Sequence, residues 1–273
     1  MILGIDIGGT TISLGLVDKK EVVKKVCVPS FAKEASLNQT LDYLGDRIAE
    51  ILTPEVEKIG IGVPSVTDPV KGIVYDAVNI PSWQVVPLKE VLEARFCIPV
   101  FVNNDANCYA VGAAALVKEP AHVVVTVTLG TGTGVGIVSD GYLFAGTHCG
   151  AGEIGALPYL DSDYESYCSK KFFTSHGVVA KDVSVAAEAG DPKAQELMKE
   201  FGTHLGTFLA VVMYAYDPDY IVLGGGIAYA FPHFQAALWE ALRRHFPYGK
   251  TLEDLRIEAM PNADVALVGS ASL

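Results

Sequence analysis

Short apolar segments alternate with turn residues at the start of the chain. Within the first 30 residues, apolar and β-branched positions cluster into three segments, and the turn residues Gly8-Gly9 and Asp18-Lys19-Lys20 separate them. Runs of this kind, bounded by turn residues, predict β-strands. Three successive strands are therefore expected, at residues 2–7, 12–17 and 22–28.

A helical pattern follows these strands. Ser36 and Gln39 have the spacing of a capping box, in which two residues exchange side-chain and backbone hydrogen bonds at a helix N-terminus. From Leu37 to Ile51, apolar residues recur every three or four positions, and Pro54 ends the pattern. The segment is predicted to be an amphipathic helix.

Helical and extended patterns then alternate. Strands are predicted at residues 58–63, 99–103, 123–129 and 220–223, and helices at 88–96, 105–117 and 192–216. Consecutive strands followed by this alternation predict an α/β fold with a sheet covered on both faces. Because no Pro- or Ser-rich linker divides the chain, we expect a hinge near residue 110 between domains 1–110 and 111–273.

The two halves contain similar glycine turns. The chain reads Ile-Gly-Gly-Thr-Thr from Ile7 to Thr11 and Leu-Gly-Thr-Gly-Thr from Leu129 to Thr133, each between two predicted strands. The halves are therefore interpreted as related domains, each presenting a glycine-rich hairpin to a shared cleft.

Composition narrows the class of protein. Half of the residues are hydrophobic and only 19% are charged, which excludes a disordered or fibrous chain. The net charge of −12, with no dense run of Lys or Arg, disfavours a nucleic-acid partner. The five cysteines form no C-x-x-C pair, the start is no signal peptide, and no apolar run reaches the roughly 18 residues of a membrane span. We expect a cytoplasmic globular protein without a membrane segment.

Glycine turns are the candidate phosphate sites. Asp6 precedes a turn whose backbone N–H groups and hydroxyls can bind an anion, although a tight hairpin would need the same glycines without the carboxylate. Two further glycine segments, one in the middle of the chain and one near its end, favour nucleotide binding over a simple hairpin. A Mg²⁺ ion would then neutralise the negative charges of the Asp6 carboxylate and of the nucleotide phosphates. Neither a Walker A loop nor a dinucleotide fingerprint is present. The phosphate candidates are Gly8, Gly9, Thr10 and Thr11, then Gly130, Thr131 and Gly132, then Gly224, Gly225 and Gly226.

Asn104 and Asp105 follow a predicted strand and begin a predicted helix. Asp at that place has an ordinary role as a helix N-cap. It also lies at the carboxyl end of a strand, where α/β folds bind ligands. There Asp105 would accept the proton of a substrate hydroxyl as a general base, and Asn104 would bind a neighbouring hydroxyl.

Two further carboxylates are candidate ligands of a polyol. Glu153 lies among glycines, and Glu165 lies in a Tyr-rich segment. Each sugar hydroxyl left unpaired in a dry site costs about 1–3 kcal/mol, so a sugar site needs such acceptors. For Glu165, a solvated loop charge is the alternative.

Together these motifs resemble the ROK (repressor, open reading frame, kinase) sugar kinases of the hexokinase/actin-like superfamily. The similar segments occur in the family's order and cover most of the chain. They are Leu3–Thr10, Gly62-Val63-Pro64, Asn79–Trp83, Asn104–Asn107, Leu129–Gly132, Gly152–Gly155 and Leu223–Gly226.

The resemblance implies two ribonuclease H-like α/β domains flanking a cleft, with the C-terminal end of the chain joining the first domain. Most of the nucleotide site would belong to the second. Asp105 would be the catalytic base, and Asn104, Glu153, Glu165 and Pro64 would bind the sugar. Asp6 would hold Mg²⁺ through water, and the glycine turns would hold ATP. A homodimer is a further family expectation.

Departures from the family concern zinc. The family usually has a His three residues after the motif Glu, where this chain has Ala156, and a zinc loop of one His and three Cys, of which only Cys168 is present. We therefore expect a zinc-free member of the family. The identity of the sugar stays open because one sugar contact is missing.

An ATP- and Mg²⁺-dependent kinase of a hexose or amino sugar is the leading hypothesis, either glucokinase-like or N-acetylhexosamine-kinase-like. A catalytically weak sugar- or nucleotide-binding homologue is the alternative. A sugar-responsive repressor is disfavoured because the first strand is predicted from residue 2, which leaves no helix-turn-helix before it. A kinase of carboxylate substrates is disfavoured because an acidic pocket would repel anions.

Overall fold

The computed structural model describes residues 1–77, 79–147, 149–262 and 264–273. Its contacts divide the chain into two units. The first unit comprises Met1–Glu119, Tyr142–Ala151 and Ala263–Leu273, and the second comprises Pro120–Gly141 and Gly152–Asn262. Compared with the expected domain 1–110, the first unit extends to Glu119 and includes an additional internal segment.

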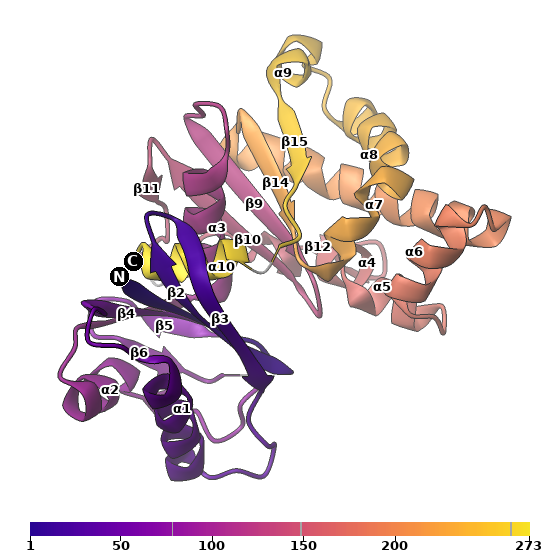
Figure 1. The fold of residues 1–273 in the computed structure, drawn as a ribbon. Helices are drawn as coiled ribbons and strands as arrows, with labels where there is room; N and C mark the ends of the chain where they lie inside the picture. Colours follow the sequence, from indigo (N-terminus) through magenta and orange to yellow (C-terminus); the bar gives the residue numbers. More distant parts are fainter. Residues whose placement is uncertain (78, 148, 263) are drawn as a thin grey trace. The chain divides into compact units, whose positions relative to one another are not determined.

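The first unit contains a five-stranded sheet and the helices around it (Figure 1). The strand order is β3-β2-β1-β4-β8, antiparallel among the first three strands and parallel from β1 to β8. A small sheet of β5, β6 and β7 follows β4. The elements are β1 (Ile2–Ile7), β2 (Thr11–Asp18), β3 (Glu21–Pro29), α1 (Leu37–Ile51), β4 (Lys58–Val63), β5 (Val66–Asp68), β6 (Ile73–Tyr75), β7 (Val85–Val86), α2 (Leu88–Phe96), β8 (Val100–Asn104), α3 (Asp105–Leu116), β11 (Tyr142–Leu143) and α10 (Asp264–Ala271).

The apolar periodicities account for this layer. The inward residues of β1, β2 and β4 and the apolar face of α1 form one buried cluster. The predicted capping box begins α1: Ser36 N donates to Gln39 Oε1 at 2.9 Å, and Gln39 N donates to Ser36 Oγ at 3.4 Å. The predicted strand–strand–strand–helix order is confirmed.

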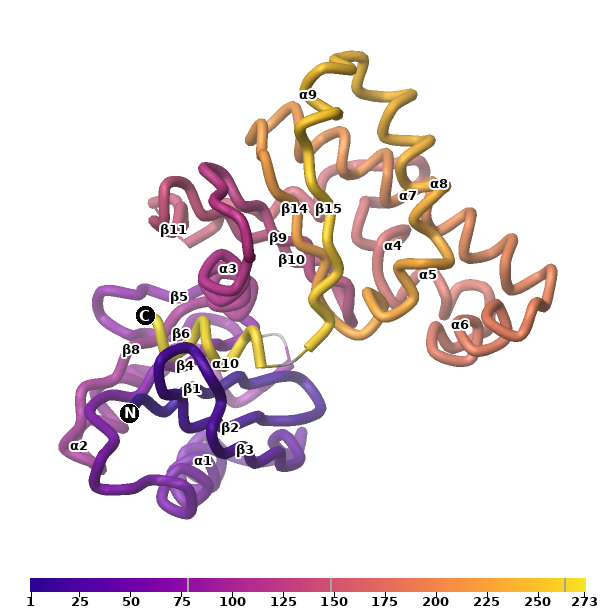
Figure 2. Tube along the Cα trace, turned by 45° about the horizontal axis from the view of Figure 1, so that its top comes forward, coloured from indigo at the N-terminus to yellow at the C-terminus, as the bar shows by residue number. Residues whose placement is uncertain are grey.

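Helix α10 belongs to the first unit although it is the last helix in sequence. It packs against α3, β1 and β4, and in both ribbon and tube views it lies beside these elements (Figures 1 and 2). Glycines permit this close approach: a Cβ on Gly60 would overlap the carbonyl oxygen of Ser270, and one on Gly112 would overlap that of Val265. An ion pair of 2.8 Å between Lys25 and Asp264 also joins α10 to β3.

In the main sheet of the second unit, the strands of that unit have the order β10-β9-β14-β15, and β12 and β13 form a separate small hairpin. Strands β9 and β10 form an antiparallel hairpin, and β14 pairs parallel with both β9 and β15. The elements are β9 (Val123–Leu129), β10 (Thr133–Ser139), the 3₁₀ helix η1 (Glu153–Ala156), β12 (Pro158–Tyr159), β13 (Ser162–Asp163), α4 (Tyr164–Cys168), α5 (Lys170–Ser175), α6 (Ala180–Glu188), α7 (Pro192–Tyr216), β14 (Tyr220–Gly224), the 3₁₀ helix η2 (Gly226–Ala230), α8 (Phe231–His245), α9 (Gly249–Asp254) and β15 (Arg256–Ala259).

Helices α7 and α8 pack side by side in the second unit. Gly202 and Gly206 lie one turn apart on α7, and a Cβ at either position would overlap a backbone carbonyl oxygen of α8, that of Phe234 or that of Leu238. The two backbones therefore approach more closely than any larger residue would permit. Beside them, Phe172, Phe173 and Phe201 form a buried aromatic cluster.

Across the described residues, none of the helices is both long enough and apolar enough to span a membrane.

Candidate functional site

The parallel strands of the first unit bring several predicted site residues to one edge. Asp6 pairs with Gly62 of β4, which pairs in turn with Asn103 of β8, and Val63 pairs with Asn104. Because the carboxyl ends of parallel strands meet at one edge of a sheet, Asp6, Pro64 and Asn104 all belong to this edge. The electrostatic influence of both Asp6 and Asp105 on the Cys108 thiol agrees with that placement.

The turn between β1 and β2 is a tight hairpin. Gly8 N donates to Thr11 O at 2.8 Å, so this N–H serves the turn itself. Ser30 supports the hairpin from the side, since its Oγ donates to Gly8 O at 2.7 Å and its N donates to Thr10 O at 2.9 Å. Gly9, Thr10 and Thr11 are exposed and therefore available to a ligand.

Asp6 is a partly buried carboxyl beside this turn. Burial raises its pKa from 3.8 to about 6, and the positive charge of Lys25 opposes that rise only in part. A desolvated carboxylate gains stability from a cation, and Mg²⁺ keeps several of its waters when one or two carboxylates hold it. The chemistry of Asp6 therefore fits a magnesium ion bound through water.

Asn104, rather than Asp105, is the N-cap of α3. Its Oδ1 accepts hydrogen bonds from Ala106 N at 2.9 Å and Asn107 N at 3.2 Å. Asp105 is the first residue of the helix, and its Oδ1 accepts from Ala106 N at 2.9 Å. The ordinary capping role considered for Asp105 thus belongs mainly to its neighbour.

Asn104 is also tied to the segment after β4. Its Nδ2 donates to Ser65 O at 3.3 Å, next to Pro64. Ser65 is itself held, because its hydroxyl donates to Tyr75 O of β6. Ser65 did not stand out as a site residue in the sequence, although its position directly after Pro64 was a usable signal.

In the second unit, two predicted phosphate segments lie together. Gly224 pairs with Thr128 at the carboxyl ends of β14 and β9. Gly225 has a φ of +78°, and a Cβ there would lie 2.5 Å from Leu129 O, directly before the Gly130–Gly132 turn. The glycine turn and the Gly224–Gly226 segment therefore form one continuous backbone surface.

Glu165 contacts this same turn. Its Oε2 accepts from Thr133 N at 3.1 Å, and its Oε1 lies 2.6 Å from Lys171 Nζ. Gly132 makes room for the carboxylate, since a Cβ there would overlap Glu165 Oε2. No sequence signal pointed to Lys171, which lies six residues after its partner.

Glu153 begins the short helix η1. The residue before η1 must be a glycine. Gly152 has a φ of +96°, and a side chain at this position would place its Cβ against Val135 O. Partial desolvation and then the negative charge of Glu165 raise the pKa of Glu153. The two carboxylates are therefore close enough to affect each other within the second unit.

Among the described side chains, no three His, Cys, Asp or Glu residues gather into a group that could hold a metal ion. The zinc-free interpretation stays a prediction.

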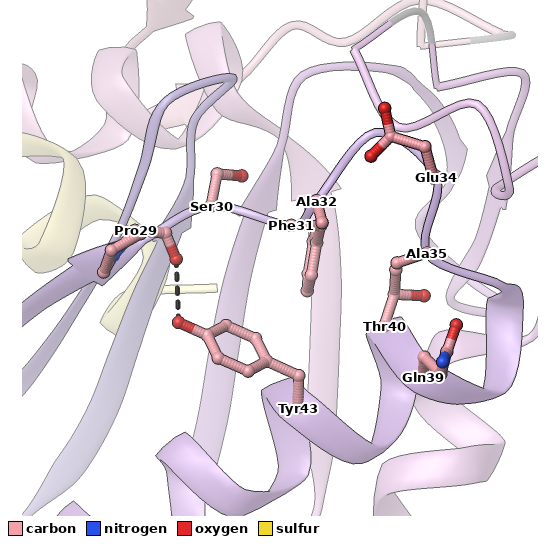
Figure 3. A pocket seen from close by; sticks show the side chains of 9 residues that line it. All are labelled: Pro29, Ser30, Phe31, Ala32, Glu34, Ala35, Gln39, Thr40 and Tyr43. Carbon is pink, nitrogen blue, oxygen red and sulfur yellow. Dashed lines mark hydrogen bonds between the residues drawn. The ribbon is translucent and has the colours of Figure 1, made fainter.

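A pocket of about 550 Å³ lies beside the first hairpin, between the end of β3 and the start of α1 (Figure 3). Tyr43 closes one side of the pocket, because its hydroxyl donates a hydrogen bond to Pro29 O at 2.9 Å. Thr40 Oγ1 accepts a hydrogen bond of 2.8 Å from Nε1 of the buried Trp83. None of the described lining residues is a predicted site residue.

Known proteins resemble the chain over nearly its full length. The ROK family matches residues 2–273. A glucokinase of Halalkalibacterium halodurans is 31% identical and covers 89% of this chain and 84% of its own length. An N-acetyl-D-glucosamine kinase of Citrobacter koseri is 29% identical and covers 90% of both chains.

A solved structure of the same family has a similar fold. The ROK family glucokinase of Streptomyces griseus, in complex with glucose and AMPPNP, superposes with a TM-score of 0.83 at 26% identity and covers 99% of this chain and 98% of its own. The predicted fold class, an α/β fold of the two-domain actin-like ATPase kind, is confirmed. The match over residues 2–273 and the agreement in fold place the chain in the ROK family.

Proposed function

We propose that the protein transfers the terminal phosphoryl group of ATP to a hydroxyl of a hexose or amino sugar. The observation that carries this proposal is the β8–α3 junction, where Asn104 caps the helix and Asp105 occupies its first position at the carboxyl edge of a parallel sheet. The glucokinase and N-acetyl-D-glucosamine kinase relatives support a sugar as the acceptor.

Asp105 has the catalytic role in this proposal. It accepts the proton of the attacking sugar hydroxyl, which a carboxylate positioned at a strand end can do. Asn104 donates one amide hydrogen to Ser65 O, and the second amide hydrogen serves a neighbouring sugar hydroxyl. Pro64, in the segment that Asn104 holds, contributes to the same binding surface.

Glu153 and Glu165 of the second unit bind further sugar hydroxyls. Glu165 is already oriented by Thr133 and Lys171, so its carboxylate needs little additional ordering. Burial and the charge of Glu165 raise the pKa of Glu153, and hydrogen bonds donated by sugar hydroxyls would offset this by stabilising the charged carboxylate.

The glycine segments hold the phosphates of ATP. In the first unit, the exposed Gly9, Thr10 and Thr11 bind them, and Gly8 shapes the turn through its own N–H. In the second unit, the binding groups belong to Gly130, Thr131, Gly132, Gly224, Gly225 and Gly226. Asp6 holds Mg²⁺ through water. The ion supplies neutralisation of charge that develops on the phosphates.

The experiment is a sugar panel with Mg-ATP and coupled detection of ADP. We expect at least one hexose or N-acetylhexosamine to stimulate ADP release above the rate without sugar, and the preferred sugar to distinguish a glucokinase from an amino-sugar kinase. ADP release that no sugar stimulates would contradict the proposal.

Asp105→Asn tests the base. Removing a general base typically lowers the rate by about 10²–10⁴-fold, so kcat should fall by that factor while KM for the sugar changes little. Asp76→Asn, at an exposed position directly after β6 in the same unit, is the control and should keep normal kcat. A normal rate in Asp105→Asn would show the base assignment to be wrong.

A further inference from the structure

Cys149 has an unusual backbone for its residue type. Its φ is +58°, in the left-handed region, and its side chain is 5% exposed. A residue with a Cβ in this region costs about 1–2 kcal/mol relative to the right-handed one, and such strain persists where the surroundings hold it. The side-chain contacts of Cys149 are therefore the place to seek its role.

The thiol uses its donor and its acceptor capacity within the first unit. Cys149 Sγ donates to Asn103 Oδ1 at 3.2 Å and accepts from Asn107 Nδ2 at 3.3 Å. Thr67 Oγ1 also lies 3.5 Å from the sulfur as a donor. All four residues are buried, with at most 6% of any of them exposed, so removing the thiol takes a hydrogen bond from Asn103, Asn107 and Thr67 where no bulk water can replace it.

Asn103 connects this cluster to the proposed catalytic residues. Its Oδ1 accepts three hydrogen bonds, from Cys149, from Asn107 Nδ2 at 3.1 Å and from the backbone N of Asn104 at 2.8 Å. Asn107 N in turn donates to the capping oxygen of Asn104. A rotation of the Asn103 amide would therefore displace Asn104 and the start of α3, where Asp105 lies.

We propose that Cys149 is a positioning residue that fixes the Asn103 amide and, through it, the orientation of Asn104 and Asp105. The inference rests on the function proposed above, because it gives Cys149 its effect through the catalytic base. Cys149 also lies two residues before Ala151, the last residue of its first-unit segment. The thiol thus anchors the chain four residues before Glu153.

Cys97 offers a matched control. It is a second cysteine of the first unit with a left-handed backbone, with φ +55° at the C-cap of α2, but it is exposed. Replacing either cysteine with Ala leaves the same backbone strain, whereas only Cys149→Ala removes hydrogen bonds from Asn103. Differences between the two variants therefore report the thiol contacts.

The test compares Cys149→Ala, Cys149→Ser and Cys97→Ala. Since a misplacement of about 1 Å can cost about 10²-fold in rate, Cys149→Ala should lower kcat about tenfold or more, with KM for ATP within about twofold of the original value. Cys149→Ser keeps a donor and an acceptor and should recover most of the lost kcat. Cys97→Ala should behave as the unmodified protein.

Hydrogen–deuterium exchange gives a readout that needs no activity. The amides of Asn104, Ala106 and Asn107 are hydrogen-bonded at the junction, so a peptide covering them should exchange faster in Cys149→Ala and at the normal rate in Cys97→Ala. Unchanged exchange, or unchanged kcat in an active enzyme, would overturn the proposal.

If no sugar stimulates ADP release but exchange accelerates as expected, the proposed function is wrong and the structural positioning stands. If Cys149→Ala does not fold, Cys149→Ser decides: normal exchange and kcat there support the proposal, and accelerated exchange with normal kcat contradicts it.

Discussion

At the residue scale, neighbouring side chains share roles that a sequence motif cannot separate. Asn and Asp are both favoured at helix N-caps. From the sequence alone, Asp105 could therefore be either the N-cap of the helix or a general base. The structure assigns the cap to Asn104 through its bonds to Ala106 N and Asn107 N. The N-cap is the residue whose backbone is still extended just before the helix begins. Here that residue is Asn104, the last residue of β8.

Other residue contacts had no sequence signal because they join distant positions. Glu165 meets Thr133 across 32 residues of chain, and Cys149 meets Asn103 across 46. Glycine turns and paired strands could be predicted locally, but these pairs depend on tertiary packing. The sequence thus identified candidate groups of the site, while the partners that orient them required the fold.

The partly buried carboxyl of Asp6 predicts that the stability of the metal-free protein depends on pH. Its pKa is 3.8 when exposed and about 6 in the folded chain, so the folded state binds the proton more tightly. The resulting stabilisation is present below pH 4, is lost as the pH rises through 6, and stays lost above that value. Since one pKa unit corresponds to about 1.4 kcal/mol, the loss reaches at most about 3 kcal/mol.

Asp6→Asn removes this titration. Urea unfolding without divalent cations should show the variant more stable than the original protein above pH 6, with the difference vanishing near pH 4. Asp18→Asn, which removes an exposed carboxylate at the end of β2, is the control. An Asp6→Asn curve parallel to that of the original protein at every pH would contradict the burial argument.

At the scale of elements, hydrophobic periodicity predicted the longer strands and helices, which have one face buried in the core. Strands β1 to β4 and helices α1 and α7 follow from spacing, caps and Pro or Asp-Pro stops, and the structure confirms them within one or two residues. The short strands β5, β6 and β7 were not predicted, because two or three residues carry too little periodicity to distinguish a strand from a loop. Their register comes from pairing with one another.

The contact between α7 and α8 predicts sensitivity to a single methyl group. Gly206→Ala and Gly202→Ala each place a Cβ against a carbonyl oxygen of α8, and overpacking of this kind costs about 1–3 kcal/mol. Chemical denaturation should show a loss of stability of that size for either variant. Gly249→Ala is the control, because a Cβ there meets no atom within 4 Å, and it should be neutral or slightly stabilising. Equal stability of all three variants would contradict the close approach.

At the scale of the whole molecule, three separate stretches of chain build the first unit and two build the second. The similar glycine turns in the two halves predicted two domains, and the family resemblance predicted the return of the C-terminal end to the first. It did not predict that Tyr142–Ala151 belongs to the first unit, because no change in composition marks where that segment begins or ends.

Leu267→Ala tests whether α10 stabilises the first unit in particular. Leu267 is fully buried and lies against Gly4 and Gly15, and loss of a buried leucine costs about 2–5 kcal/mol. Hydrogen–deuterium exchange should accelerate in peptides of β1 and β4 and stay near normal in those of β9 and β14. Leu238→Ala, fully buried on α8 of the second unit, should give the reverse pattern. Equal acceleration in both units would show that α10 has no such preference.

The late position of α10 in the chain has a consequence for biosynthesis. A ribosome releases the sheet of the first unit long before it makes residues 264–271, and the whole second unit emerges in between. Until then, the close contacts of Gly4, Gly60 and Gly112 with the backbone of α10 cannot form. The first unit therefore cannot complete its packing until residues 264–271 have been made, whereas a unit built from one consecutive stretch could fold as soon as that stretch emerges.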